Sequence, residues 1–130
     1  MIEAVLGAAA VAAAACAPLQ ALMEETLGPR GEIAAGAVAY VGLADAPGCT
    51  VSLRGGTELG AGVFEIASKI DSALAAQGWR RDPSADADGA GATAAGYVRD
   101  DRRLTVTVER DQPEAGPYAV VLGLRSASGR

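Results

Sequence analysis

One amphipathic segment separates two groups of alternating segments, and this order restricts the chain to few folds. Apolar side chains recur with helical spacing from Val63 to Leu74, and Gly78 follows as a suitable C-terminal cap. We therefore predict a helix over about 62–77. A single helix set between strand-like segments predicts an α+β domain, in which the helix packs on an antiparallel sheet of four to six strands.

The strand-like segments are short and are recognised by alternation or by apolar content. They cover residues 33–43, 49–54, 79–81, 97–99, 103–110 and 118–125. Ala44 to Gly48 contains Pro and Gly and predicts a turn. Asp82 to Gly96 is dominated by Ala, Asp and Gly, so we expect a loop with few large apolar side chains.

The N-terminal part has two readings. Ala4 to Pro18 is apolar and shorter than the roughly 20 residues that span a bilayer, which suits the hydrophobic region of a signal peptide. Alanine is also the best helix former, so the same residues suit a structural helix. We divide the chain into 1–18, signal-like or Ala-rich helical, and 19–130, a single α+β domain that starts with a second helix up to Leu27.

Two local patterns resemble a known class of proteins. Ala13-Ala14-Ala15-Cys16 resembles the lipobox of bacterial lipoproteins, in which the cysteine becomes the lipidated first residue. It departs from that motif at Ala13, where the family prefers Leu, and Glu3 stands where positive charge is usual. From 62 to 125, the order of helix, Gly-Trp, strand, acidic loop, hairpin and strand resembles small uncharacterised exported lipoproteins of GC-rich bacteria. The resemblance implies export and a lipid anchor at Cys16, and it implies no activity.

Composition narrows the classes of function. The chain has no His, which removes the commonest general base and metal ligand. Its net charge of −5 disfavours nucleic-acid binding. Ser84 to Gly89 has the spacing of the start of a calcium loop, but Ala95 stands where the bidentate Glu belongs. We therefore expect no catalytic residues, no metal and no cofactor.

Cys16 and Cys49 allow three arrangements. In an exported chain without an anchor they would form a disulfide. If Cys16 carries lipid, Cys49 is a single thiol. In a cytosolic protein both would be small core residues.

One group of aromatic and Arg residues offers a surface for a ligand or a partner. Interleaved Asp residues weaken its positive field, so it does not predict nucleic-acid binding. The group consists of Trp79, Arg81, Tyr97, Arg99 and Arg103.

The sequence thus predicts a non-enzymatic exported domain, with or without a lipid anchor, in the cell envelope or secreted. It would act through contacts with a protein or a small ligand. The alternative is an acidic cytosolic partner-binding protein, of the inhibitor or immunity type, in which the N-terminal helix belongs to the fold.

Overall fold

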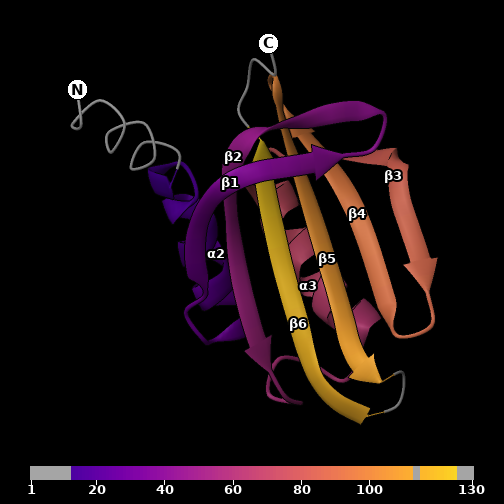
Figure 1. Cartoon of the computed structure of the whole chain (residues 1–130). Coiled ribbons are helices and arrows are strands. Elements are labelled where there is room, and N and C mark those ends of the chain that lie inside the picture. The colour runs from indigo at the N-terminus through magenta and orange to yellow at the C-terminus, as the bar shows by residue number, and fades with distance from the viewer. Residues whose placement is uncertain (1–12, 113–114, 126–130) are drawn as a thin grey trace.

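Two helices cover one face of a six-stranded antiparallel sheet in a computed structural model that describes residues 13–112 and 115–125 (Figure 1). The strand order is β1-β2-β6-β5-β4-β3. The elements are α2 (Ala17–Leu27), β1 (Glu32–Tyr40), β2 (Leu43–Gly55), α3 (Val63–Ala76), β3 (Arg80–Gly89), β4 (Ala92–Arg99), β5 (Arg102–Gln112) and β6 (Ala115–Arg125). The predicted α+β class is confirmed. Most of the signal-like segment 1–18 lies outside the described residues.

Helix α3 forms where its apolar spacing predicts it. Ile66, Ile70 and Leu74 have no exposed surface and point to the sheet. The helix ends at Ala76, and the chain turns away at Gly78, whose φ of +89° is accessible to glycine without strain; the Trp79 amide donates to the Leu74 carbonyl. Phe64 lies on the outer face and is 59% exposed.

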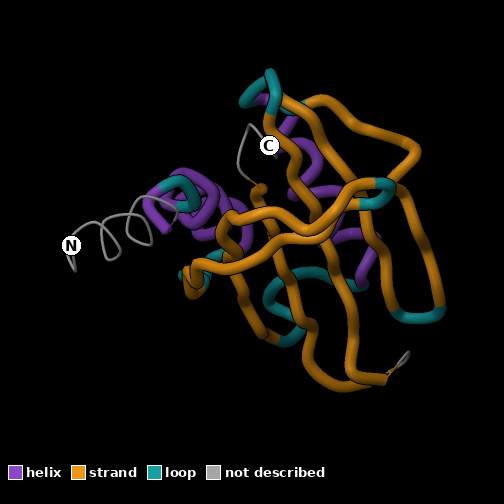
Figure 2. Tube along the Cα trace, turned by 45° about the horizontal axis from the view of Figure 1, so that its top comes forward, coloured by secondary structure: helices purple, strands orange, loops and turns teal. Residues whose placement is uncertain are grey.

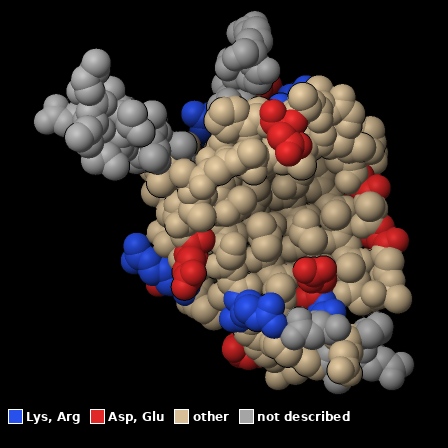
Figure 3. Space-filling view, viewed as in Figure 1, with Lys and Arg blue, Asp and Glu red and all other residues tan. Residues whose placement is uncertain are grey.

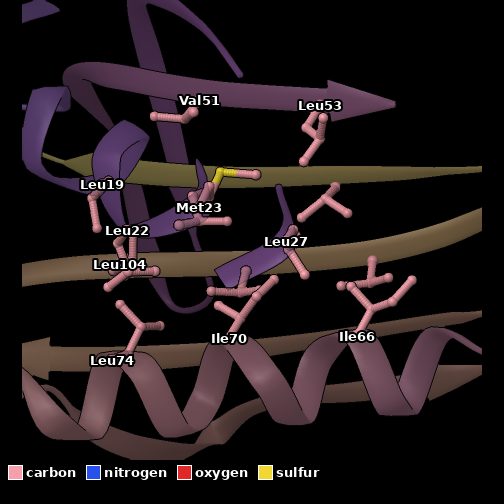
Figure 4. Close-up of a cluster of buried hydrophobic side chains, with 14 of the residues drawn as sticks. Leu19, Leu22, Met23, Leu27, Val51, Leu53, Ile66, Ile70, Leu74 and Leu104 are labelled. Carbon is pink, nitrogen blue, oxygen red and sulfur yellow. The ribbon is translucent and has the colours of Figure 1, made fainter. Parts of the chain in front are cut away.

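A single apolar core fills the space between the helices and the sheet (Figure 4). Helix α2 contributes four buried side chains, and the central strand β6 contributes alternate residues that point to the helices. Burying a side chain of this size contributes roughly 1.5–3 kcal/mol. The core members of these two elements are Leu19, Leu22, Met23, Leu27, Tyr118, Val120, Leu122 and Leu124.

Two sequence predictions about turns and loops are wrong. Residues 82–96 are not a loop, because they form most of the β3–β4 hairpin. Their small side chains offer little apolar area, but the backbone groups still pair with their neighbours. Residues 44–48 are not a turn, because they belong to β2. The chain instead reverses at Val41 and Gly42, where Gly42 has a φ of +77°.

The β1–β2 hairpin leaves the sheet at a pair of glycines. Pairing of β2 with β6 starts at Gly48, and Gly36 lies opposite Gly48 in the β1–β2 ladder. A Cβ atom at Gly48 would collide with the Leu124 carbonyl oxygen, so only glycine allows this close approach. Beyond this pair, residues 37–47, here called the crossing arm, run over the helix-free face of the sheet (Figure 2).

The two edges of the sheet differ. Pro83 interrupts β3, and four residues of β3 between Asp82 and Ala87 face only Ala95 of β4. A proline and a bulge both disrupt the ladder that a further strand would need. Strand β1 has no proline, and its register with β2 is regular from Glu32 to Val38; a shift occurs only beyond this part, between Val38 and Tyr40.

Candidate functional site

The helix-free face of the sheet is uncharged at its centre. Charged side chains lie toward the margins of this face (Figure 3). Strands β4, β5 and β6 present small or β-branched residues here, among them Ala94, Thr105, Thr107 and Val121, all of which are partly exposed. Neither of the described helices α2 and α3 lies over this face, and the crossing arm covers only part of it (Figure 1).

A hollow of about 500 Å³ lies between the crossing arm and the sheet. Alanine is the commonest residue of its lining, which also holds two threonines and a single carboxylate from the crossing arm. The lining residues are Ala39, Tyr40, Val41, Leu43 and Asp45 from the β1–β2 hairpin, Ala85 from β3, Ala94 and Ala95 from β4, and Thr105 and Thr107 from β5.

Two large apolar side chains at the tip of the hairpin stay in solvent at the rim of the hollow. Val41 is 58% exposed and Leu43 is 49% exposed. In a domain with so few large apolar residues, leaving two of them in water beside one concavity is a feature of a binding surface. Sequence reasoning does not single them out. The only signal is their position on either side of Gly42 in the hairpin turn.

The crossing arm is fastened at its far end to β3. The Tyr40 hydroxyl donates a hydrogen bond of 2.6 Å to Oδ2 of Asp82, which lies 42 residues away in the sequence. Oδ1 of Asp82 accepts from the backbone amide and the hydroxyl of Ser84, which holds the start of the β3 bulge. Gly96 provides the space, since a Cβ there would be 2.5 Å from the Tyr40 hydroxyl oxygen.

The hydrogen bond shifts the pKa values of both partners. Burial raises the pKa of Tyr40 well above its usual value, and the bond to Asp82 raises it further. The same bond lowers the pKa of Asp82, with help from Ser84. Both shifts favour a neutral phenol that donates to a charged carboxylate at neutral pH.

Asp82 is expected to make stability depend on pH in the acid range. Its pKa is lower in the folded than in the unfolded chain, so its contribution is present above about pH 4 and is lost as the pH falls through the folded pKa. Urea unfolding of the wild type and of Asp82→Asn checks this. The difference between their midpoints should be larger at pH 6 than at pH 2.5, and a constant difference would contradict it.

A second cavity of about 290 Å³ lies on the helix side, between α3 and the β3–β4 hairpin. The Tyr97 hydroxyl donates 2.7 Å to Asp71 of α3, and burial raises the pKa of Tyr97 well above its usual value. Arg81 bridges Asp71 at 3.4 Å and Asp86 at 2.6 Å. The exposed Phe64 is at the rim. Tyr97, Asp71, Arg81 and Asp86 are therefore already paired with one another.

The five predicted surface residues do not form one surface. Arg81 lies 5.6 Å from the Tyr97 ring centre, and Arg99 lies 4.6 Å from the Trp79 ring centre, all four on the helix side. Arg103 lies on the other face, 5.9 Å from the ring of Tyr40. Stacking on rings occupies the guanidinium faces, which leaves them less available to a ligand.

Cys16 and Cys49 are joined by a disulfide, and both are buried. The bond ties the start of α2 to β2 at the centre of the core. A thioether to lipid at Cys16 requires the same sulfur, so the bond and the anchor exclude each other in one molecule.

The described part of the chain comprises residues 13–112 and 115–125. Among those residues no group of three or more His, Cys, Asp or Glu side chains is placed to hold a metal ion. Asp86 and Asp88, from the calcium-like spacing, instead contact Arg81 and Thr93. Neither described helix is long and apolar enough to span a membrane.

Comparison with known proteins adds no further assignment. No protein-family model matches the chain, and no curated protein or solved structure is significantly similar to it.

Proposed function

We propose that this chain is an exported, non-enzymatic binding domain that holds a small uncharged molecule in the hollow beneath the crossing arm. The observation that carries the proposal is the exposure of Val41 and Leu43 at the rim of that hollow. An apolar ligand that covers these two side chains would remove their apolar surface from water, which favours binding.

The lining decides the class of ligand. The hollow is within the range of roughly 300–1,000 Å³ that small-molecule sites occupy. No Lys or Arg is among the lining residues, so an anionic ligand would find no counter-charge. Alanine and valine favour an apolar body, and the hydroxyls of Thr105 and Thr107 can hydrogen-bond one polar group.

Export is supported by the disulfide. Such bonds persist in oxidising compartments and are rare in the cytosol, where thiols are kept reduced. Buried Cys16 and Cys49 are adjacent in the fold although 33 residues separate them in sequence. This favours export without an anchor over the lipidated form and over the cytosolic alternative. The absence of His is consistent with a binding role.

The compartment is tested by intact mass after expression in a bacterium with the natural N-terminus. A soluble product that is lighter than the thiol form by its two sulfhydryl hydrogens supports the proposal. A membrane-bound product that starts at Cys16 and carries acyl chains would replace it with the anchored form. A soluble, unprocessed product with both thiols free would overturn export.

The site is tested by fluorescence titration with Nile red, an uncharged apolar dye. Thr107→Arg fills part of the hollow with a long charged side chain and should weaken binding of the uncharged dye at least about tenfold. Ser52→Arg is the matched control, because it adds the same charge to the same sheet face outside the hollow, and it should bind within about twofold of wild type.

Two results would contradict the proposed site. One is a wild-type titration without saturable binding, and the other is equal affinity for wild type and Thr107→Arg. Thermal unfolding of both variants shows that they are folded.

A further inference from the structure

Resting on the proposed function, we propose that the crossing arm is a hinged flap that opens to admit the ligand and is closed by the Tyr40–Asp82 hydrogen bond. Three independent features carry this: a boundary where the arm leaves the sheet, a fastening at its other end, and a hollow between them.

The boundary is the glycine pair. From Gly48 to Ser52, strand β2 is paired on both sides, with β1 and with β6; from Leu43 to Pro47 it is paired with β1 alone. The arm is thus connected to the sheet ladder only through the rung of Gly36 and Gly48. Gly36 has no neighbouring atom within 4 Å of where a Cβ would lie, so nothing packs against this point of the arm. Hinges of this kind lie at the ends of elements and often use small residues.

The fastening is at the opposite edge of the sheet. Tyr40 reaches Asp82 on β3, and the ring of Tyr40 also lies near Arg103. Between hinge and fastening the arm rests on β6, where a Cβ at Gly123 would be 3.2 Å from Cγ1 of Val38. The guanidinium of the buried Arg125 donates to the Val38 carbonyl at 3.5 Å. Two charge-assisted hydrogen bonds and the burial of Val38, Tyr40 and Ala46 therefore hold the arm closed.

The closed arm covers part of the hollow. Tyr40 and Ala85, which stands in the bulge next to Asp82, both line it. A ligand seated in the hollow would contact the arm and the sheet together, and it would stabilise the closed position. Opening the arm is the simplest way to exchange that ligand with solvent, as for other lids.

Thiol labelling tests the motion without any ligand. Val38→Cys places a thiol beneath the arm, and Val106→Cys places one in the core on the helix side; the native valines are 4% and 3% exposed. If the arm opens while the core stays folded, iodoacetamide should label the first thiol faster than the second. Equal labelling rates would mean that only global unfolding exposes Val38, and would overturn the flap.

Two tyrosine variants sharpen the test, because each removes one hydrogen bond from a tyrosine to an aspartate. Tyr40→Phe should accelerate labelling at position 38 about tenfold. Tyr97→Phe removes the bond to Asp71, which both the closed and the open forms would keep. It should accelerate labelling at position 106 and leave position 38 unchanged. Acceleration of position 38 by Tyr97→Phe to the same extent as position 106 would overturn the flap.

A second variant and a ligand readout separate the flap from the proposed function. Asp82→Ala removes the acceptor and should accelerate labelling at position 38 as Tyr40→Phe does. In stopped-flow mixing, Tyr40→Phe should also raise the association rate of Nile red. Fast labelling at position 38 without Nile red binding would retain the flap and overturn the proposed function. Nile red binding with equal labelling rates at positions 38 and 106 would retain the proposed function and overturn the flap.

Discussion

Replacing both cysteines, by Cys16→Ala with Cys49→Ala, is expected to lower the free energy of unfolding by about 3–4 kcal/mol. The disulfide links two residues that are 33 positions apart in the sequence, and this link lowers the conformational entropy of the unfolded chain. It also joins α2 to β2 inside the core, so its loss is expected to loosen α2 first. Urea unfolding under non-reducing conditions measures the change.

Reduction of the wild type is the matched control for this variant. Dithiothreitol should move the urea midpoint of the wild type toward that of the double variant and should leave the double variant where it is. A double variant that unfolds with the wild-type midpoint in the absence of reductant would show that the bond contributes no stability.

Truncating α3 on its inner face is expected to cost about as much. Ile70 has no exposed surface, and Ile70→Ala should lower the free energy of unfolding by about 2–5 kcal/mol, through lost burial and the cavity left behind. Phe64→Ala on the same helix is the control. Because Phe64 is 59% exposed, its truncation should change stability by no more than about 0.5 kcal/mol.

The two helix variants together test the orientation of α3. Urea unfolding with unchanged slope gives both free energies. A large loss in Phe64→Ala with a small loss in Ile70→Ala would mean that the helix presents the opposite face to the sheet.

The elements with strong periodicity could be predicted from the sequence. The stripe from Val63 to Leu74 and the alternation of Leu104, Val106 and Val108 each bury one face against the core, and burial is what creates such patterns. In the hairpin of residues 80–99, only the outer ends at 79–81 and 97–99 could be predicted as strands, because the rest of β3 is almost entirely exposed and has no large apolar side chains. Its order comes from backbone pairing with β4.

The candidate site was beyond sequence reasoning for a different reason. Tyr40 and Asp82 are 42 residues apart, and the sequence around either residue does not indicate that it contacts the other. When the sequence is read alone, Gly36 only makes the predicted strand of residues 33–43 less favourable, and Gly48 only belongs to the predicted turn of residues 44–48. Only the register that places them opposite each other shows where the arm leaves the sheet.

The unequal edges of the sheet limit how copies of this chain can associate. Pro83 and the bulge make β3 a poor template for another strand, whereas the regular part of β1 can still accept one. Edge-to-edge pairing through β1 would use the same strand of both copies. Neither β1 edge is therefore free once a dimer has formed. At high concentration, association of this domain through its sheet edges would therefore stop at dimers, because β3, the second edge that continuous fibre growth requires, is blocked.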